Sequence, residues 1–562
     1  MFPLFRINRS IRSIRRYLNI VRVLSTYGFD QALEMLGLAD MLVRSRRLLR
    51  RTNSPDLARL SAAERMRLAL EELGPTFVKL GQLLSTRPDV IPHAFVHEFE
   101  KLQDDVPSFP FEDVTDQLVR ELGGPVESFF AEIDPEPLAA ASIAQVHRAR
   151  LISGEDVVIK VRRPGIVELV ESDISALMSL ARLAERHIPG SEIYDPVALV
   201  REFARTIRRE MDFTREGHTI EKFRDNFAQT SWMYFPTVYW EQSARGVLTM
   251  EYVDGIKVTD RERFDQLGVD RRLIARRGAD AFLEMVLSHG FFHGDLHPGN
   301  VLILPDNVIC LLDYGIVGRL DEGLKTFLTD ILYAIVNRDM DEVGSLLLFA
   351  GDISDNLDIR ALKRDLSNII DGYYEIPLKE IEVGRMLMEF IEIITLYNIR
   401  IQPDLMLLAK SLVLIESMGR SLNPAFNMVE HLRPVIDKAL RRKYSPRSVS
   451  RDLNKILFSY LNLARNLPRD LKEFINRINR NKFKIDLEHR GLDKFTADFD
   501  RSINRLSISL ILSAMIIGSS IIMQTDKGPQ LFGFPVLAFT GYTTAGLIGL
   551  WLVYAIIRSG RM

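Results

Sequence analysis

The stretch HGDLHPGN, residues 293–300, decides the fold of this chain. It holds Asp295 and, five residues later, Asn300, and a further acid, Asp313, follows after thirteen residues in LLDYG. An Asp and an Asn at this spacing usually cap a turn, and a lone DYG is usually a turn as well. The meaning of these residues therefore depends on the segments that precede them.

A lysine and a group of acids precede this stretch in a definite order. Lys160 lies in the apolar, strand-like run VVIKV, and Glu210, Asp212 and Glu216 follow in the helical segment REMDFTREG. The strand-like segment LTMEYVDG then leads into a predicted larger lobe. A strand lysine, a helix acid, an Asp-x-x-x-x-Asn and an Asp-Tyr-Gly in this order indicate the nucleotide site of a protein-kinase-like fold.

The chemistry of a nucleoside triphosphate requires these residue types. A fixed cation must meet the phosphates, and Lys160 is placed for that, while an acid on the following helix must hold the lysine. Magnesium prefers oxygen ligands, which Asp313 and Asn300 can supply. Asp295 can accept a proton from an attacking hydroxyl or position a water. We therefore expect ATP and Mg²⁺ as cofactors.

The phosphate loop departs from the usual glycine-rich form. The segment from Phe130 to Val161 alternates apolar and polar residues around an SGED turn, which predicts antiparallel strands. The loop between them reads AAAS, residues 139–142. Alanine keeps this loop small but reaches positive φ less easily than glycine, so we expect a stiffer loop. The residues expected to contact nucleotide are Leu138, Ala139, Ala140, Ala141, Ser142, Val146, Lys160, Glu216, Glu251 and Val253.

The pattern as a whole predicts an α+β fold. We expect a protein-kinase-like bilobal fold with a helical N-terminal extension and a C-terminal transmembrane helical hairpin. The expected domain boundaries are 1–52 for basic amphipathic helices, 53–130 for the helical extension, 131–255 for a sheet-rich N-lobe, 256–440 for a helical C-lobe, 441–505 for a charged helical linker and 506–557 for two membrane helices. A chain of 562 residues has room for several domains.

Two uncharged segments lie near the C-terminus. Leu506–Met523 has 18 residues without a charge and Leu531–Ile557 has 27, so each is long enough to cross a membrane as a helix. Arginines flank the pair on both outer sides, which places both ends on the cytoplasmic side by the positive-inside rule. A buried hairpin in the core of a soluble domain is the alternative. The flanking arginines are Arg501, Arg505, Arg558 and Arg561.

Composition limits the classes of function. A formal net charge of −2 gives no overall attraction to nucleic acid. Residues 1–52 carry eleven Arg and no Lys, which suits anionic lipid or the acidic face of another protein. An Arg-rich transit peptide and a solvated basic helix are the alternatives for this arm. Cys310 is the one cysteine, so a disulfide within the chain is excluded, and its apolar surroundings predict a packed core thiol.

Seven motifs carry a resemblance to a known family. They are KLGQ (79–82), LQDDVP (102–107), PLAAASIAQVHRA (137–149), VVIKVRRPG (157–165), EMDF (210–213), HGDLHPGN and DYG. From about Leu73 to Gly318 the chain resembles the UbiB/ADCK (AarF) family of atypical protein-kinase-like proteins. The resemblance implies a membrane-anchored atypical kinase or ATPase that supports ubiquinone, or isoprenoid quinone, biosynthesis. It also implies a multi-pass protein of the bacterial inner membrane with a cytoplasmic catalytic domain.

The same resemblance assigns roles in the helical extension. In this family the helix with KLGQ covers the active site, and its lysine, Lys79, faces the Glu-x-Asp acids, which here are Glu210 and Asp212. Gln82 lies on the same face of the helix and is predicted with these residues as a lid contact. Glu216 is then the partner of Lys160. The alternative is that Lys79 and Gln82, three residues apart, simply lie on the solvent-exposed face of an amphipathic helix. A covering helix blocks peptides but admits a small or lipid-like molecule, so membrane lipid, quinone precursors and other quinone-biosynthesis proteins are the expected partners.

Several activities stay open at this point. Gly294 stands where many kinases carry an Arg that receives an activation-loop phosphate, so that mode of control is not expected here. No Ala-Pro-Glu follows Asp313, which leaves little platform for a peptide substrate. This absence disfavours a protein kinase. ATP-driven handling of lipid precursors is the expected function. A small-molecule or lipid phosphotransferase, and a nucleotide-binding scaffold of a quinone-biosynthesis complex, are the alternatives.

Overall fold

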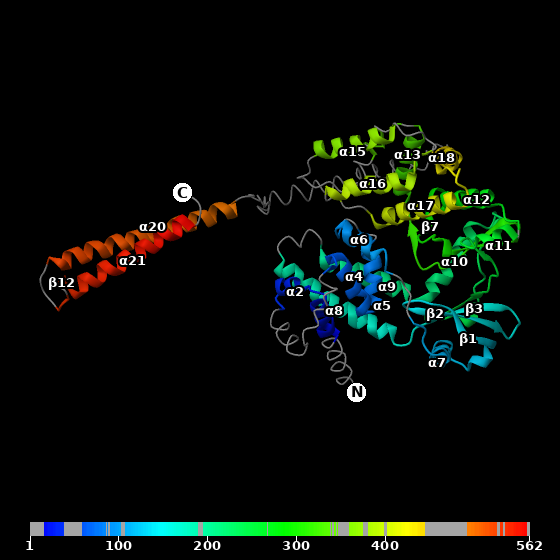
Figure 1. Cartoon of the computed structure of the whole chain (residues 1–562), viewed down its shortest axis with the longest axis horizontal. Coiled ribbons are helices and arrows are strands. Elements are labelled where there is room, and N and C mark those ends of the chain that lie inside the picture. Colours follow the sequence, from blue (N-terminus) through cyan, green and yellow to red (C-terminus); the bar gives the residue numbers. More distant parts are fainter. Residues whose placement is uncertain are drawn as a thin grey trace, which may run out of the picture. The chain divides into compact units, whose positions relative to one another are not determined.

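A computed structural model gives the structure of the chain. It describes residues 16–38, 59–85, 87, 90–102, 107–188, 195–266, 268–337, 339, 342–343, 345–346, 359–374, 380–397, 399, 402–443, 492–524, 529–531 and 534–558. The chain forms two compact units, Met1–Arg451 and Asp452–Met562, which are described separately (Figure 1). Residues 1–15 and 39–52 of the basic arm, 103–106 of the LQDDVP motif and 444–491 of the predicted linker lie outside the described residues.

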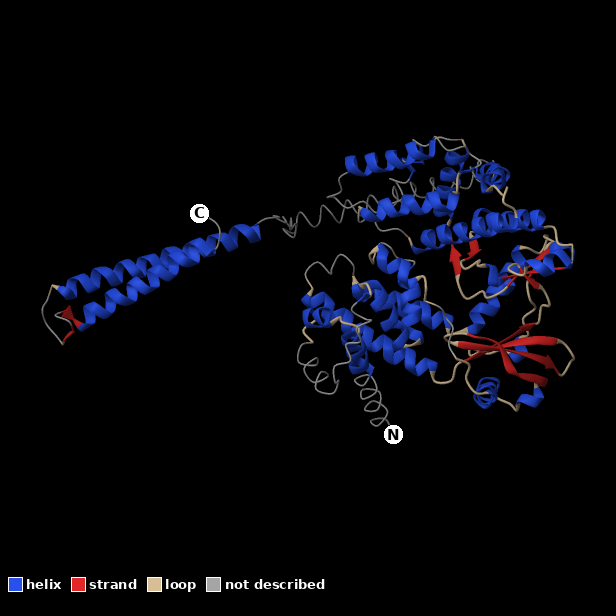
Figure 2. Cartoon of the chain, in the orientation of Figure 1, coloured by secondary structure: helices blue, strands red, loops and turns tan. Residues whose placement is uncertain are grey.

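A four-stranded antiparallel sheet forms the smaller lobe of the first unit (Figure 2). Its strands, in spatial order, are β1 (Phe130–Ala140), β2 (Ala144–Leu151), β3 (Asp156–Arg162) and β5 (Val247–Glu251). Side chains alternate along a strand, and alternation in β3 buries Val157, Ile159 and Val161 in a cluster with residues of α7 (Phe111–Leu122). Lys160 is out of phase with these three and therefore points away from that cluster.

The extension and the part of the chain around the smaller lobe are helical. The helices are α2 (Asp30–Met35), α4 (Ala62–Leu73), α5 (Pro75–Ser85), α6 (His93–Phe99), α8 (Ile166–His187), α9 (Pro196–Glu210) and α10 (Phe213–Asn226). The helix α5 carries the KLGQ motif and buries Phe77, Val78 and Leu80 in the main hydrophobic core. This burial fixes which face of α5 its polar residues occupy.

The larger lobe combines short strands with long helices. One sheet has the order β4-β9-β8-β6 and a second pairs β7 with β10. The strands are β4 (Met233–Tyr234), β6 (Ile256–Lys257), β7 (Phe291–His293), β8 (Val301–Leu304), β9 (Val308–Leu311) and β10 (Val317–Arg319). The helices are α11 (Arg261–Gln266), α12 (Arg271–Leu283), α13 (Glu322–Val336), α15 (Ile359–Tyr374), α16 (Val383–Leu396), α17 (Pro403–Leu422) and α18 (Met428–Lys443). Helix α12 continues into a π-helical turn, Glu284–His289, which leads to β7.

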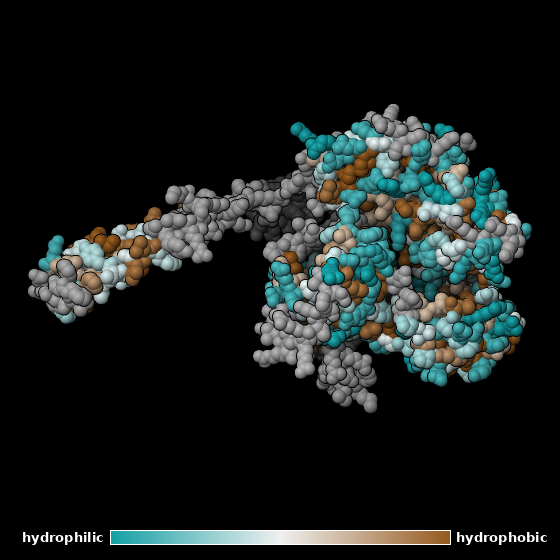
Figure 3. Space-filling view, in the orientation of Figure 1, coloured by the Kyte–Doolittle hydropathy of each residue, from teal (hydrophilic) through white to brown (hydrophobic). Residues whose placement is uncertain are grey.

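The second unit is a helical hairpin of α20 (Leu492–Met523) and α21 (Val536–Arg558), joined through a small β-ladder of β11 (Gln530–Leu531) and β12 (Phe534–Pro535). Small residues line the helix contact: Ala538 and Ala545 are buried, and a Cβ at Gly541 would lie 2.0 Å from the Ser519 hydroxyl. Large apolar side chains such as Leu510, Leu547 and Trp551 are exposed on its outside, where Figure 3 shows hydrophobic residues.

One described helix meets the length and composition needed to cross a membrane. Leu506–Met523 has a mean hydropathy of 2.2 over 18 residues and is 6% buried within the structure. Val536–Leu552 is a shorter apolar helix. The predicted second span, 531–557, becomes helical only at Val536, because its first residues form the β-ladder. The helical hairpin is therefore present, whereas a double crossing of the membrane stays a prediction.

Candidate active site

Lys160 is the centre of a charged cluster between the two lobes. Its Nζ donates to both carboxylate oxygens of Glu216 on α10, each at 2.8 Å, and lies 3.4 Å from Oδ1 of Asp313. The Lys160 ammonium also lies 5.5 Å from the centre of the Phe213 ring. Glu216 and Asp313, which lie 56 and 153 residues after Lys160 in the sequence, thus both contact its ammonium group.

The charges of this cluster stabilise one another. Burial lowers the pKa of Lys160, but the carboxylates of Asp313 and Glu216 outweigh it and raise that pKa above its ordinary value. The positive charge of Lys160, opposed by burial, lowers the pKa of Asp313 to about 2, and Lys79 contributes in the same direction. Burial raises the pKa of Glu216, and Lys160 opposes that rise. We infer that Lys160 and Asp313 are charged at neutral pH.

Asp313 has an unusual backbone conformation. Its φ of 51° lies in the left-handed region, which most residues avoid, although Asp and Asn tolerate it better than others. The Asp313 side chain is 55% exposed, and its Oδ1 also accepts from the Gly315 N–H at 3.3 Å. Such a conformation costs about 1 kcal/mol or more and persists at functional sites. This carboxylate is therefore held in a turn, near a cation and open to solvent.

A buried histidine joins Asp313 to the loop with Asp295. Nδ1 of His293 accepts from the Asp295 backbone N–H at 3.2 Å, so Nε2 carries the proton and donates to the Leu312 carbonyl at 3.1 Å. Burial lowers the pKa of His293, which keeps the ring neutral. The side chain of Asn300 donates to the Asp295 carbonyl at 3.1 Å. These bonds fix the loops that carry the three predicted catalytic and metal-binding residues.

Gly294 is explained by packing. A Cβ at this position would lie 2.7 Å from Leu407 and 2.8 Å from Ile316. The Gly294 carbonyl also accepts from the Ser411 hydroxyl of α17 at 3.1 Å. No side chain, and least of all an arginine, fits between this loop and α17, so the arginine found in many kinases is sterically excluded.

The AAAS loop forms a tight connection from β1 to β2. The Ala141 N–H donates to the Ala144 carbonyl at 2.8 Å, and the Arg163 N–H donates to the Ile143 carbonyl at 2.8 Å. Ser142 is fully buried, and its hydroxyl has no hydrogen-bond partner in the structure. An unpartnered buried hydroxyl costs free energy unless a ligand satisfies it.

The other residues predicted to contact nucleotide lie around the sheet. Val146 pairs directly with Lys160 across β2 and β3. Leu138 on β1 is 52% exposed. The Glu251 carboxylate accepts from the Tyr234 hydroxyl at 2.6 Å and from the Thr237 N–H at 3.1 Å. The side chain is therefore occupied, and the predicted nucleotide contact would use the backbone of Glu251. Val253 follows directly in the segment that leads to the larger lobe.

The lid helix α5 makes one of the ion pairs expected of it. Lys79 Nζ lies 2.7 Å from Oε1 of Glu210, and both side chains are mostly buried. The Gln82 amide instead donates to the Leu102 carbonyl at 3.1 Å, within the extension. The Asp212 carboxylate accepts from the Thr214 hydroxyl at 2.6 Å at the start of α10. A lid role for Gln82 and Asp212 stays a prediction beside these local contacts.

We expect charge reversal at the lid pair to loosen α5. Lys79→Glu places a carboxylate beside Glu210 in a mostly buried site, and it removes the positive charge that helps to lower the pKa of Asp313. Hydrogen-exchange protection of α5 amides should fall about tenfold or more, and the double reversal with Glu210→Lys should restore most of it. The exposed Arg150→Glu replacement is the control. Equal protection in all four proteins would mean that this pair does not hold the lid.

A buried polar network supports the loop end of the sheet, and the sequence analysis did not assign it. Nδ1 of His147 donates to the Asp134 carbonyl at 2.8 Å, and Nε2 accepts from the Gln145 amide at 2.8 Å. Oε1 of Gln145 accepts from the Phe109 N–H at 2.9 Å. The residue types carried a signal, because the polar Gln145 and His147 flank the apolar Val146 within the predicted strand.

Acidification should destabilise the first unit through its buried histidines. Burial lowers the pKa of His147 and of His293, so both rings are neutral when folded but take up a proton in the unfolded chain below about pH 6.5. The free energy of unfolding thus has its full value above about pH 6.5. It falls as the pH drops below that value, by up to about 1.4 kcal/mol per pH unit for each histidine.

Melting temperatures measured between about pH 7.5 and about pH 5.5 test this expectation. His147→Gln should lose less stability over this range than wild type, because glutamine does not titrate. The control is His97→Gln, whose ring is 75% exposed. An unchanged pH dependence in His147→Gln contradicts the proposed role of this ring.

The described residues do not form a metal site by themselves. Among them, no group of three or more His, Cys, Asp or Glu side chains could hold a metal. Magnesium, however, is usually held by one or two protein oxygens together with substrate phosphates and water, and Asp313 and Asn300 supply oxygens of this kind. His293 and His297 do not form a metal site: His293 is bonded to backbone groups, and Nδ1 of His297 accepts from the Gly299 N–H.

Three family models match the chain. An ABC1 atypical kinase-like domain matches residues 101–347, a UbiB helical domain matches 366–427, and an ABC1/UbiB kinase-like C-terminal domain matches 490–558. The last two cover the helical part of the larger lobe and the C-terminal hairpin.

Similar proteins cover most of the chain. A Marinobacter nauticus protein named "Probable protein kinase UbiB" is 32% identical over 88% of this chain and 91% of its own length. A Pseudomonas putida protein of the same name is 35% identical over 83% and 87%. An uncharacterized Clostridium pasteurianum protein is 32% identical over 98% and 100%. A Mycobacterium tuberculosis protein solved with erythromycin aligns with a TM-score of 0.41 at 21% identity over 62% of this chain and 91% of its own.

Proposed function

Because the chain belongs to the ABC1/UbiB family of atypical kinase-like proteins, we propose that it binds ATP with Mg²⁺ and turns the nucleotide over in support of isoprenoid quinone biosynthesis. One observation carries the nucleotide part of this proposal. Lys160 lies within contact distance of both Glu216 and Asp313, which is the arrangement that positions phosphates beside a metal-binding carboxylate.

Each residue of the cluster has a separate task in the proposed reaction. Glu216 holds Lys160 at the position where the phosphates bind, and Ser142 offers a hydroxyl donor nearby in the AAAS loop. Asp313 and Asn300 would hold Mg²⁺, which neutralises the charge that develops on the phosphate oxygens. Asp295 accepts the proton of the attacking water or hydroxyl. His293 holds the loop of Asp295 beside the loop of Asp313 through its two hydrogen bonds to the backbone.

The lid favours a small or lipid-like acceptor over a peptide. Helix α5 is joined to α9 through Lys79 and Glu210, and Lys79 is close enough to Asp313 to lower its pKa. A helix in this position restricts the approach of an extended peptide. Water, a small molecule or a lipid headgroup is therefore the proposed phosphate acceptor.

The C-terminal hairpin supports a membrane location. The apolar helix Leu506–Met523 is long enough to span a bilayer, and the exposed apolar surface of the hairpin would be covered by lipid. We place the chain in the inner membrane with the kinase-like unit in the cytoplasm. In this location, ATP turnover would assist access of soluble enzymes to hydrophobic quinone precursors.

Steady-state ATP turnover by the full chain in lipid nanodiscs tests the proposal. We expect Mg²⁺-dependent release of phosphate, and no release when EDTA is present. A phosphorylated lipid in the products instead of free phosphate would assign a phosphotransferase. The absence of both nucleotide binding and turnover would reject the enzymatic proposal.

A further inference from the structure

The motif VVIKVRRPG contains an arginine, Arg162, that the proposed reaction does not use. It lies two residues after Lys160, at the end of β3. Its side chain is 15% exposed and forms an ion pair with Glu121 of α7, with 2.6 Å between Nη2 and Oε1. A guanidinium removed from water in this way must find partners for its remaining donors, and these partners indicate its role.

Arg162 reaches the corner between α9 and α10. Its Nη1 donates to the Met211 carbonyl at 2.9 Å, and Met211 is the residue that ends α9 just before α10 begins. The N–H of Phe213, the first residue of α10, donates to the Arg245 carbonyl at 3.0 Å. Both bonds join this corner to the strands of the smaller lobe. The start of α10 is therefore fixed relative to the strand that carries Lys160.

The surroundings of Arg162 are built closely around its guanidinium. The second oxygen of Glu121, Oε2, accepts from the Gly246 N–H at 3.1 Å, and the Gly246 carbonyl accepts from the Arg162 N–H at 2.9 Å. A Cβ at Gly246 would overlap the Glu121 carboxylate and lie 3.0 Å from Nη2 of Arg162. The φ of Gly246 is not left-handed, so this close packing explains the glycine. A planar guanidinium can meet a carboxylate and a carbonyl at once.

Helix α10 is held again one turn further on. Gly217 lies against the Trp240 ring, and a Cβ on it would come within 2.7 Å of that ring. The Trp240 indole N–H donates to the Glu221 carboxylate at 2.7 Å. Glu216, which bonds Lys160, lies between the corner and this contact. Two attachments of α10 to the smaller lobe thus bracket the glutamate that meets the lysine.

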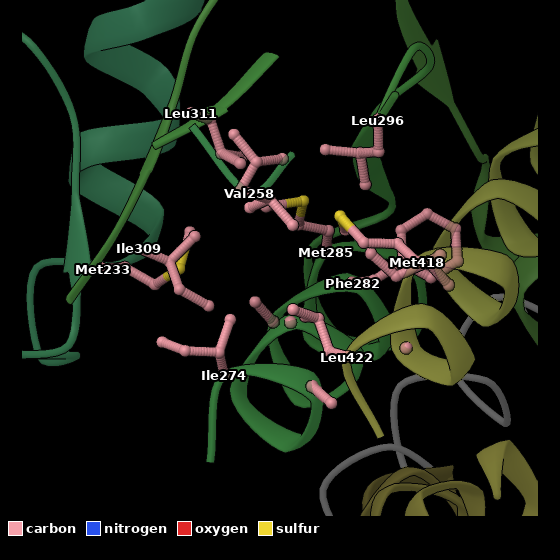
Figure 4. A pocket seen from close by; sticks show the side chains of 16 residues that line it. Met233, Val258, Ile274, Phe282, Met285, Leu296, Ile309, Leu311, Met418 and Leu422 are labelled. Carbon is pink, nitrogen blue, oxygen red and sulfur yellow. The ribbon is translucent and has the colours of Figure 1, made fainter. Parts of the chain in front are cut away.

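The other side of the site is anchored in the core of the larger lobe. Leu296 and Leu311, which lie next to Asp295 and two residues before Asp313, belong to the main hydrophobic core. Figure 4 shows both among the apolar side chains of this lobe. The placement of these two loops depends on packing within the larger lobe. The placement of Glu216 depends instead on where α10 starts.

In protein kinases the position of the helix that carries this glutamate controls whether the lysine–glutamate pair forms, and so whether the enzyme is active. We propose that Arg162 is a positioning residue that holds the start of α10 and keeps the Lys160–Glu216 pair formed in the chain without nucleotide. Its consequence for ATP binding rests on the proposed function, whereas the position of α10 does not require turnover.

Chemical labelling of Lys160 tests the position of α10 without ATP. The full chain in phosphatidylcholine nanodiscs is treated briefly with acetic anhydride, and acetylation of each lysine is measured by mass spectrometry. Lys160 should react slowly in wild type, because the carboxylates of Asp313 and Glu216 raise its pKa. Arg162→Met should speed its acetylation about tenfold, since a pKa lower by about one unit gives about ten times more neutral amine. Equally slow acetylation in both proteins would overturn the proposal.

Glu121→Gln separates positioning from stability. Glutamine removes the ion pair but keeps an oxygen that accepts from Arg162, so the bond from Arg162 to Met211 stays in place. We expect lower stability in this variant but acetylation of Lys160 near the wild-type rate. Acetylation as fast as in Arg162→Met would show that the ion pair only stabilises the fold, and it would overturn the proposal.

Two further variants complete the labelling experiment. Arg150→Gln is the control, because it breaks an exposed ion pair with Asp156 beside β3 and should leave acetylation of Lys160 unchanged. If Arg162→Met does not fold, Arg162→Gln replaces it, since glutamine is too short to reach both Glu121 and Met211. Acetylation of Lys160 should rise severalfold in that variant, and an unchanged rate in a folded Arg162→Gln protein would overturn the proposal.

ATP kinetics give a second readout. When only a fraction of the molecules has the pair formed, the apparent affinity for ATP falls by that fraction, although bound ATP still selects the paired state. Arg162→Met should therefore raise the KM for ATP about tenfold and keep kcat within about twofold. A lower kcat with an unchanged KM would indicate loss of folded protein alone and would overturn the proposal. A wild-type chain that shows the expected labelling but no ATP turnover would contradict the proposed function and leave the role of Arg162 standing.

Discussion

Replacing Asp313 by asparagine is expected to lower Mg²⁺-dependent ATP turnover by about 10³-fold, because one oriented charge in a catalytic site contributes roughly 10²–10³-fold and the loss of metal binding adds to it. Asparagine keeps the size of the side chain and tolerates the left-handed φ of 51° at this position, so the fold should be retained. The charge opposite Lys160 is lost, and with it the carboxylate that would hold the metal.

The control for this experiment is Asp306→Asn. Asp306 is exposed, also has a left-handed φ, at 61°, and lies in the turn between β8 and β9. Turnover by that variant should equal wild type. Phosphate release from labelled ATP measures both variants, with nucleotide affinity measured in parallel. Wild-type turnover by Asp313→Asn would exclude this residue as the metal ligand.

Replacing Glu216 by leucine is expected to destabilise the first unit by about 3–5 kcal/mol, the usual cost of removing one partner of a buried ion pair. Lys160 and Glu216 side chains are 15% and 7% exposed, so the lysine left behind keeps Asp313 but loses both short hydrogen bonds to Glu216. Denaturant unfolding followed by hydrogen exchange in β3 measures this loss.

The double variant Lys160→Met, Glu216→Leu separates stability from function. An apolar pair of similar volume often restores the stability that one deletion removes. We therefore expect near wild-type stability but no measurable ATP binding. The control, Glu171→Leu, breaks a more exposed pair with Arg208 and should cost at most about 1 kcal/mol. ATP binding by the double variant would show that Lys160 does not contact the phosphates.

Cys310 illustrates a prediction that local sequence could make. Its apolar run predicted a core thiol, and the structure buries it completely in β9, where burial raises its pKa to about 12. This inference depends on hydrophobicity and strand pattern, which are encoded within a few residues.

The choice between alternative polar partners required the folded chain. Glu210, Asp212 and Glu216 all lie within seven residues, and sequence spacing by itself does not decide which of them meets Lys160, Lys79 or a local backbone group. The structure pairs Glu216 with Lys160 and Glu210 with Lys79, and leaves Asp212 at the start of α10.

The sequence by itself determined the order of chemical groups, the kinase-like class and the apolar character of the C-terminal helices, because periodicity and motif spacing are local properties. Only the tertiary structure decided the hydrogen-bond partner of Gln82 and the network around His147. Both depend on groups from different parts of the chain, which come together only when the helices and strands pack.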